Sequence, residues 1–333
     1  MAAALFLRAH SAPEAARLLP DGDAVLYVSL KPFHLASNFG SQTANREPEY
    51  EEFIRETGIQ FDRDLDEAAI AVHPAEPTTA NGSTEMQRRF SEVFIGHYDA
   101  LNLKHYLHKQ ASSVESYRDH EVFVIPHEGR MVRVALLGVD IVAVSNTTDG
   151  ATIRGIIDRY RAIALPFGGP ALVRKHYKDV PLTSAAWAIS SLTTPNGENA
   201  TLPLPGGIGL ALPKDTVTVA SLRYLGSVQF KVEAFTSSES DAKRVTDSAT
   251  NFLQLFRAIE NNTQPSGPDP DVKTFFDSIK VEQKGSRSLL TAELPKGFLK
   301  KAFSATPDAA LPIEEPRARE MTPAHKPTAK NKQ

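Results

Sequence analysis

One stretch, VQFKVEAF at residues 228–235, decides the fold of this chain. Four apolar side chains point to one side of an extended chain, those of Val228, Phe230, Val232 and Ala234, and Gln229, Lys231 and Glu233 point to the other. This alternation is typical of an antiparallel sheet that has one face packed on a core and one face in water. The sequence therefore predicts a half-buried antiparallel strand here.

The segments around this strand continue the same pattern. A strand at Thr216–Leu225 precedes it, and the turn residues Gly226-Ser227 separate the two. A long amphipathic helix is predicted at Asp241–Glu260, where apolar residues recur at helical spacing. The remaining elements predicted for this region are a strand at Ser184–Ser191 with the only tryptophan, a helix that begins at Asp269-Pro270, a hairpin of Ile279–Gln283 with Ser288–Leu294, and a short helix at Phe298–Phe303.

The N-terminal half shows strands and short helices in a similar order. A helix is expected after Pro48, another after Asp99 and a third after Thr147 or Thr148. Pro74–Gly82 is rich in Pro, Thr, Asn and Gly, so a loop is predicted there. The strands predicted in this half are Ala24–Leu30, Ala68–Val72, Glu92–Tyr98, Glu121–Ile125, Met131–Leu137 and Ile141–Ser145.

These elements predict an α+β fold of two similar modules, each a mostly antiparallel sheet with amphipathic helices packed on one face. The similar order suggests one duplicated module at the level of topology. A length of 333 residues also fits two domains, at roughly 150 residues each. The predicted divisions are an N-terminal stub at 1–17, a first module at 18–164, a linker at 165–181, a second module at 182–304 and a disordered tail containing Pro and Lys at 305–333.

Composition excludes several classes of function. Lys and Arg total 37 against 40 Asp and Glu, so the chain lacks the basic excess that a general nucleic-acid binder needs. The absence of cysteine excludes disulfides, thiolate metal sites and cysteine nucleophiles. The chain also has no run of about 18 apolar residues that would span a membrane.

Three histidines form the strongest candidate for a metal site. His105 and His108 are three residues apart on a predicted helix, and His97 comes from the strand before it. However, both helical histidines adjoin Lys104 or Lys109 on the polar side of that helix. A solvated helix face is therefore favoured over a metal site, and no cofactor is predicted.

Ser240 is the only candidate nucleophile. Ser240-Asp241-Ala242-Lys243 matches the Ser-x-x-Lys pattern of serine acyl-enzymes, but the Ser-Asp-Asn and Lys-Thr-Gly motifs that accompany it are missing. Ser240 also stands where the long helix needs an N-cap, so capping is the favoured role. No P-loop, dinucleotide fingerprint or His-Glu-x-x-His motif is present.

The N-terminal Ala2–Leu7 run, followed by Arg8, leaves two alternatives open. It is either a frayed chain end or the last part of a membrane anchor that begins upstream of Met1. In the C-terminal tail, Lys326, Lys330 and Lys332 follow the last acid, Glu320, and a solvated tail is the favoured interpretation.

Three stretches give the chain a resemblance to uncharacterised bacterial proteins tethered to the cell envelope. They are Leu18-Leu19-Pro20-Asp21-Gly22-Asp23-Ala24 before one strand, Phe61-Asp62-Arg63-Asp64-Leu65-Asp66 before another, and Gly226–Phe235 leading into the helix at Ala242–Ile259. The resemblance implies one N-terminal anchor and tandem α+β modules, with no assigned activity. The Ala2–Leu7 run is shorter than the anchor that this resemblance leads us to expect.

The sequence favours a non-enzymatic, envelope-associated binding or scaffold protein whose partner is another protein or an envelope component. This hypothesis predicts an exposed sheet face or an apolar patch between the modules. Two alternatives remain: a metal-dependent or serine hydrolase that uses the His97, His105 and His108 region or Ser240, and a carrier of lipid or a small apolar ligand. The expected location is the envelope or periplasm, or the cytoplasm if Met1 is the true start.

Overall fold

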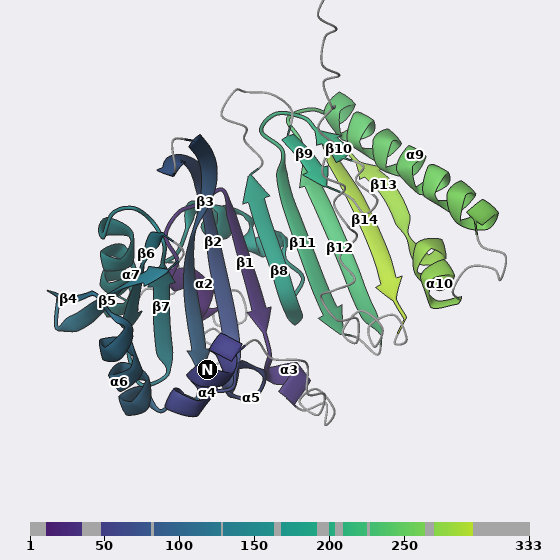
Figure 1. Cartoon of the computed structure of the whole chain (residues 1–333). Helices are drawn as coiled ribbons and strands as arrows, with labels where there is room; N and C mark the ends of the chain where they lie inside the picture. Colours follow the sequence, from purple (N-terminus) through teal and green to yellow (C-terminus); the bar gives the residue numbers. More distant parts are fainter. Residues whose placement is uncertain are drawn as a thin grey trace, which may run out of the picture.

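The computed structural model describes residues 11–34, 48–80, 83–127, 129–162, 168–191, 200–203, 209–224, 227–263 and 270–295. In this part of the chain, 12 strands form one sheet and β9 with β10 forms a small hairpin (Figure 1). The stub up to residue 10, the helix predicted at Phe298–Phe303 and the tail at 305–333 lie outside the described residues.

The strands of the large sheet lie in the order β13-β14-β12-β11-β8-β1-β2-β3-β7-β6-β5-β4. Their bounds are β1 (Ala24–Ser29), β2 (Leu65–Ala80), β3 (Ser83–Gly96), β4 (Ser113–Tyr117), β5 (His120–His127), β6 (Arg130–Leu136), β7 (Ile141–Ser145), β8 (Ser184–Ser191), β11 (Val217–Tyr224), β12 (Val228–Phe235), β13 (Lys280–Lys284) and β14 (Arg287–Leu294). The small hairpin consists of β9 (Ala200–Pro203) and β10 (Gly209–Leu212). The helices are α2 (Glu14–Leu18), α3 (Lys31–His34), α4 (Pro48–Thr57), α5 (Phe61–Asp64), α6 (Ala100–Gln110), α7 (Ala151–Arg161), α8 (Ala171–His176), the 3-10 helix η1 (Tyr177–Asp179), α9 (Glu239–Thr263) and α10 (Pro270–Ser278).

The α+β class is confirmed, but the two halves share one sheet instead of forming two. Val25 of β1 pairs with Ala71 of β2 on one side and with Ile189 of β8 on the other, both antiparallel. If the halves were separate sheets, β1 and β8 would each leave a row of backbone N–H and C=O groups without partners. Their pairing satisfies these groups and makes the sheet continuous across the predicted linker.

The chain follows the same path twice within this sheet. In the first half, β1, β2 and β3 run as neighbours, α6 follows, and the chain returns through β4–β7 with β7 beside β3. In the second half, β8, β11 and β12 run as neighbours, α9 and α10 follow, and β14 returns beside β12. The expected topological repeat is therefore present in the strand order.

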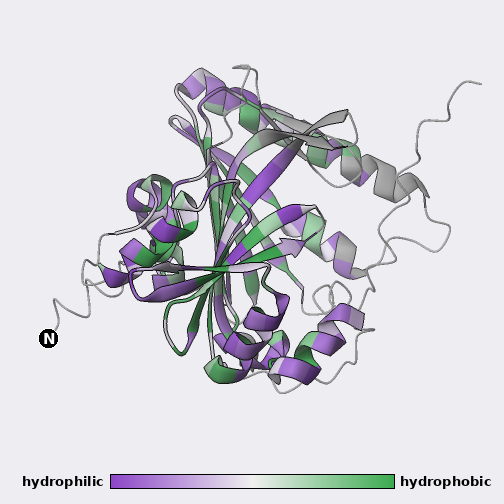
Figure 2. Ribbon diagram, turned by 60° about the vertical axis from the view of Figure 1, so that its left-hand side comes forward, coloured by the Kyte–Doolittle hydropathy of each residue, from purple (hydrophilic) through white to green (hydrophobic). Residues whose placement is uncertain are grey.

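Helices cover both faces of the sheet in the first half, so the expectation of helices on one face is wrong there, whereas α9 and α10 of the second predicted module lie on one face as expected. The back face carries α2, α7 and α8, and the front face, which faces the viewer in Figure 1, carries α4, α6, α9 and α10. Figure 2 shows helices on both sides of the strands. The reason is that adjacent strand residues are both apolar and buried, as with Val122 on the back face and Phe123 on the front.

The back-face core runs without interruption across the join between the halves. It contains Ile153 and Ile156 of α7, Leu18 of α2, Val25 of β1 and Ile189 of β8, each at most 1% exposed. Burying a side chain of this size contributes about 1.5–3 kcal/mol. The two halves therefore share one core on this face.

The loop predicted at Pro74–Gly82 is instead the outer part of a long hairpin. β2 and β3 continue to pair as far as Ala80 opposite Ser83, with an irregularity between His73 and Glu76. Pro77 tolerates this position because the described pairings of β2 with β1 end at Val72, so the outer hairpin has no further sheet neighbour on that side.

Candidate ligand-binding pocket

Two aromatic residues lie side by side where the halves join. The register between β1 and β8 places Tyr27 directly opposite Trp187 on the back face. Their ring centroids are 5.5 Å apart and their planes are inclined by 23°, which is a stacked arrangement. Both residues are buried, with exposures of 8% and 4%. This pair forms the floor of a pocket.

A third aromatic ring comes from η1. Tyr177 lies 5.5 Å from Trp187, centroid to centroid, and is inclined to it by 62°. The flanking residues Val173 and Val180 belong to the back-face core, and they anchor α8 and η1 over β8. The pocket therefore has a floor of Tyr27 and Trp187 and a wall of Tyr177, and the core beneath them holds these rings in place.

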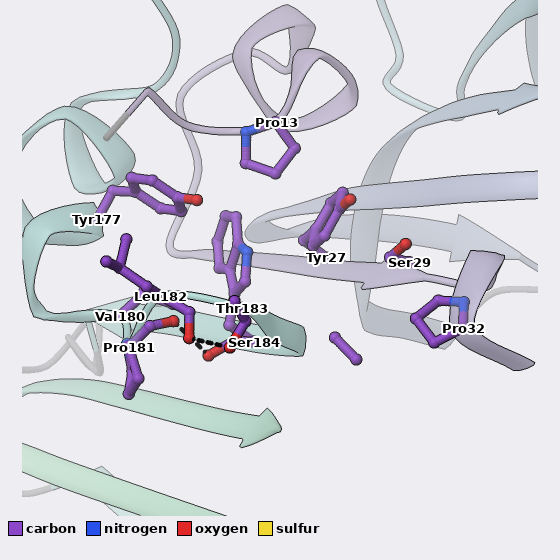
Figure 3. Close-up of a pocket in the computed structure, with 12 residues that line it drawn as sticks. Pro13, Tyr27, Ser29, Pro32, Tyr177, Val180, Pro181, Leu182, Thr183 and Ser184 are labelled. Atoms are coloured by element: carbon purple, nitrogen blue, oxygen red, sulfur yellow. Dashed lines mark hydrogen bonds between the residues drawn. The ribbon is translucent and has the colours of Figure 1, made fainter. Parts of the chain in front are cut away.

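The pocket has a volume of about 320 Å³ and opens to solvent. Figure 3 shows Tyr27 and Tyr177 on opposite sides of it, with Pro13 at one end. Leu182, which is 56% exposed, forms part of the outer wall. The residues that line the pocket, here called the aromatic pocket, are Pro13, Tyr27, Ser29, Pro32, Tyr177, Val180, Pro181, Leu182, Thr183, Ser184, Ala185 and Trp187.

The indole nitrogen of Trp187 is a buried donor without an acceptor among the described residues. A buried polar group left without a hydrogen bond costs about 1–3 kcal/mol, and most such groups in folded proteins are paired. Because this donor is buried while the pocket beside it is open, an acceptor brought by a ligand would reach it only if a side chain of the lining moved.

The tyrosine hydroxyls of the pocket stay protonated at neutral pH. Burial raises the pKa of Tyr27 above its usual value, and the Glu67 carboxylate adds to this shift. Burial also raises the pKa of Tyr177. Both hydroxyls are therefore hydrogen-bond donors, not bases. Lys31 lies near the same end of β1 and forms ion pairs with Glu67 at 3.2 Å and Asp66 at 3.9 Å.

The hydroxyls of the outer wall are already engaged by the chain itself. Thr183 has a positive φ of 65° and donates from its hydroxyl to the carbonyl of Leu182. Ser184 donates from its hydroxyl to the carbonyl of Pro181 at 2.6 Å. These bonds shape a tight turn. No carboxylate, imidazole, lysine or arginine belongs to the described lining.

The front face of the same strands is apolar and lacks a covering helix in the described part of the chain (Figure 1). Leu26 of β1 is 40% exposed and pairs with Ile70 of β2 and Ala188 of β8. Ala188 in turn pairs with Ala220 of β11. These residues form an apolar strip between the α4/α6 and α9/α10 pairs, which is the kind of surface that the binding-protein hypothesis requires.

Two of the three candidate histidines lie near acids, and the acids differ. His97 lies 3.6 Å from Asp66, and His108 lies 3.5 Å from Glu121 and packs against Phe123. His105 is exposed on α6. The described residues contain no group of three or more His, Asp or Glu residues placed to hold a metal ion.

The prediction that Ser240 is the N-cap of the long helix is wrong, because Ser238 takes this role. The hydroxyl of Ser238 accepts a hydrogen bond from the backbone N–H of Asp241 and donates one to the Asp241 carboxylate. Ser238 immediately precedes α9 and reaches the third helical N–H, which is the position that a capping side chain satisfies. The Ser240 hydroxyl contacts only that of Ser238, at 2.9 Å, in the described hydrogen bonds.

Sequence reasoning missed the aromatic pocket. Tyr27, Tyr177 and Trp187 are separated by up to 160 positions in the sequence. The one available signal was the single tryptophan in SAAWAISS, a strand otherwise made of small residues. A large side chain there indicates a position that faces other large groups. Only the pairing of β1 with β8 shows which groups these are.

Comparison with known proteins leaves the chain without a family. No family model and no curated protein matches it. Three crystal forms of TP0453 show weak structural similarity. Form III has a TM-score of 0.43 at 10% identity and covers 85% of this chain and 94% of its own. Form IV has a TM-score of 0.44 at 10% identity and covers 88% of this chain and 98% of its own. Form I has a TM-score of 0.43 at 9% identity and covers 88% of this chain and 96% of its own. These values assign no function to this chain.

The described helices were compared with the length and apolar character of a membrane-spanning helix. None of those described is long and apolar enough to cross a membrane.

Proposed function

We propose that this chain is a non-enzymatic binding protein that holds an extended, proline-containing segment of a partner protein in the aromatic pocket. The observation that carries this proposal is the group of three adjacent aromatic rings, Tyr27, Trp187 and Tyr177, in the lining of an open pocket. Grooves lined by aromatic rings are the sites where polyproline segments dock on other proteins.

The chemistry of the pocket suits such a segment in two ways. A polyproline II helix has no internal hydrogen bonds, so its carbonyls are free to accept from an indole or tyrosine donor. Its pyrrolidine rings pack flat against aromatic side chains. A volume of about 320 Å³ is near the lower end of ligand pockets, so it admits one or two small apolar groups while the rest of the peptide lies along the rim.

The lining also explains why binding is favoured over catalysis. Hydrolysis requires a nucleophile, a base and an orienting group within hydrogen-bond reach of one another. The described lining offers donors and apolar surface, and the hydroxyls of Thr183 and Ser184 are bonded to backbone carbonyls.

The fluorescence of Trp187 provides a direct test, because it is the only tryptophan in the chain. The probe is an acetylated oligoproline peptide, titrated into the full chain, with a Gly-Ser peptide of equal length as control. We expect a saturable change in emission with oligoproline and none with Gly-Ser. The absence of a saturable change would overturn the proposal, and a saturable response to a non-fluorescent apolar compound such as cyclohexanol alone would favour the small-ligand carrier instead.

Matched variants locate the binding. Tyr177→Ala removes one wall and should weaken oligoproline binding about tenfold, equivalent to about 1.4 kcal/mol. Leu182→Asp changes the exposed outer wall with little effect on the core and should also weaken binding. Tyr224→Ala, at a residue 58% exposed on β11 and outside the pocket, should leave affinity unchanged.

The cell envelope is the proposed site of this function, supported by the resemblance carried by residues 18–24, 61–66 and 226–259. Fractionation of the producing cells, with peptide mapping of the mature N-terminus, tests it. Recovery in the membrane fraction with residues upstream of Met1 supports the envelope. Recovery in the cytosol with Met1 as the first residue contradicts it.

A further inference from the structure

Three arginines from three different helices line a second pocket on the back face. Arg17 of α2, Arg159 of α7 and Arg174 of α8 surround a volume of about 260 Å³. Leu18, Ala162, Gly168 and Gly169 complete its described lining. This arginine pocket shares no described lining residue with the aromatic pocket.

Two of these arginines occupy matching positions in the two halves. Arg17 lies four residues after Pro13, which has φ −53° and ψ 150° and precedes α2. Arg174 lies four residues after Pro170, which has φ −59° and ψ 151° and precedes α8. The duplicated chain path therefore brings the equivalent helix of each half, with an equivalent arginine, to the same pocket.

The backbone around Gly169 holds the second of these arginines in place. Arg174 donates from Nη1 to the Gly169 carbonyl at 3.0 Å. Gly169 has a positive φ of 115°, and a Cβ atom there would lie 3.2 Å from the Cα of Arg17. Only glycine permits this close approach without strain. The loop thus fixes the Arg174 guanidinium at the pocket before any ligand binds.

Arg159 carries a charge that the described residues do not pair. Its Nη1 is buried without a hydrogen-bond partner among them. Burial is the largest cause that lowers the pKa of Arg159, and the Arg174 charge lowers it further, while the Asp21 and Asp158 carboxylates oppose the shift. Asp21 also accepts from the N–H of Ala171, so its charge is shared with the start of α8.

The other nearby acid, Asp158, also has partners of its own. Asp158 forms an ion pair with Arg118 at 2.7 Å and accepts from the Tyr117 hydroxyl at 3.0 Å. Arg159 and Arg174 stay charged, as arginines do in proteins, and both guanidinium groups line this pocket. The C-terminal carbonyls of α7 offset only a partial charge of about one half.

We infer that the arginine pocket is an oxyanion site that takes a phosphoryl group. Guanidinium groups bind phosphate oxygens through two parallel hydrogen bonds, and a tetrahedral anion accepts them from several directions at once. A volume of about 260 Å³ admits the phosphoryl group and leaves any larger remainder of the ligand outside. The bound anion would supply the countercharge that Arg159 lacks and would tie the two halves together.

Isothermal titration calorimetry of the full chain with inorganic phosphate, at constant ionic strength maintained with chloride, tests this site. We expect saturable binding and a melting temperature that rises with phosphate concentration, because a ligand that binds only the folded state stabilises it. An adventitious ion effect would instead give no saturation and an equal response to chloride, and this result would overturn the inference.

Variants separate a built site from general surface charge. Arg159→Gln keeps most of the side-chain length and should weaken phosphate binding about tenfold or more, since a charge-assisted pair is lost. Arg174→Gln, at an exposed residue, should have a similar effect and serves if the first variant unfolds. Arg161→Gln lies on the same helix but outside the pocket, where Arg161 pairs with Asp119 at 3.5 Å, and should leave binding unchanged. Equal losses in all three variants would contradict the site.

Vesicle sedimentation distinguishes the source of the phosphoryl group. If the source is a lipid headgroup, the protein should bind vesicles of phosphatidylcholine with phosphatidic acid but not phosphatidylcholine alone, and Arg159→Gln should abolish this binding. If inorganic phosphate binds in the calorimeter and neither vesicle does, the ligand is a soluble phosphate or phosphoester. Both results support the oxyanion site.

Discussion

The two halves of this molecule follow the same path but bury their front faces unequally. In the first half, α4 and α6 cover a described cluster of six buried residues: Ile59, Leu103, Leu107, Phe123, Val134 and Val142. In the second half, the described cluster beneath α9 contains three: Leu212, Ala234 and Val245. We infer from this difference that two halves with a similar topology differ in stability. The second half then depends on the strand pairing and the back-face core that it shares with the first.

The largest expected effect comes from the front-face cores. Phe123→Ala in the first half should cost about 3–5 kcal/mol of unfolding free energy, through lost burial and a cavity. Val245→Ala in the second half should cost about 2 kcal/mol, because it removes two methyl-sized groups at about 0.8 kcal/mol each and leaves a small cavity. Urea unfolding measures both losses.

The shared sheet adds a second expectation to these variants. Trp187 fluorescence and circular dichroism should report the same single transition in each case, because the sheet and back-face core are continuous. Separate transitions for the two probes would show that the halves unfold independently. Because Phe→Ala removes more carbon atoms than Val→Ala, Val134→Ala in the first half is the matched comparison for Val245→Ala, and an equal loss for these two valines would contradict the difference between the front cores.

A smaller loss of unfolding free energy is expected when the helix cap of either half is removed. Asp99 accepts from the N–H groups of Leu101 and Asn102 at the start of α6, and Ser238 caps α9 in the same way. Asp99→Ala and Ser238→Ala should each cost about 1 kcal/mol. Ser240→Ala is the control and should stay within about 0.5 kcal/mol of the parent. Thermal melts measure all three. A loss at Ser240 equal to that at Ser238 would contradict the assigned cap.

The smallest expected effects are pH-dependent changes in melting temperature. Their signs are opposite for Glu92 in the first half and Asp241 in the second. Burial raises the pKa of Glu92 on β3, so its charged form opposes folding above the ordinary carboxyl range. Glu92→Gln should therefore raise the melting temperature at pH 7, and the gain should vanish as the pH falls to about 3, where the carboxyl is protonated in both states.

Asp241 at the start of α9 behaves in the opposite way. Hydrogen bonds from Arg244 and Ser238 lower its pKa, so its charged form stabilises the fold above the ordinary carboxyl range. Asp241→Asn should lower the melting temperature at pH 7, and the loss should shrink as the pH falls through the lowered pKa. Shifts of the same sign for Glu92→Gln and Asp241→Asn would contradict these assignments.

Local patterns in the sequence were enough to locate most elements of the second half. The alternation at 228–235 matches β12, and the amphipathic stripe predicted at Asp241–Glu260 lies within α9. The hairpin predicted at 279–283 and 288–294 corresponds to β13 and β14 within one residue. These predictions succeeded because side-chain periodicity depends on which residues are buried within one element.

Patterns failed where distant strands decided the outcome. Pro74 and Pro77 indicate a loop locally, yet the pairing of β2 with β3 extends through them. Ser240 had the right residue type for a cap but was two positions too late, because the helix begins where Ser238 can reach the N–H of Asp241. Boundaries of this kind depend on backbone geometry that residue types alone do not determine.

Composition alone gives the near-neutral charge and excludes cysteine chemistry. Side-chain periodicity was enough to predict the α+β class and most strand and helix positions, because it reflects which residues are buried within one element. Long-range strand pairing and packing explain why the halves share one sheet, why helices cover both of its faces, why Tyr27 stacks on Trp187, and why Arg17 and Arg174 line one pocket. These contacts join residues about 160 positions apart, and only the pairing of β1 with β8 brings them together.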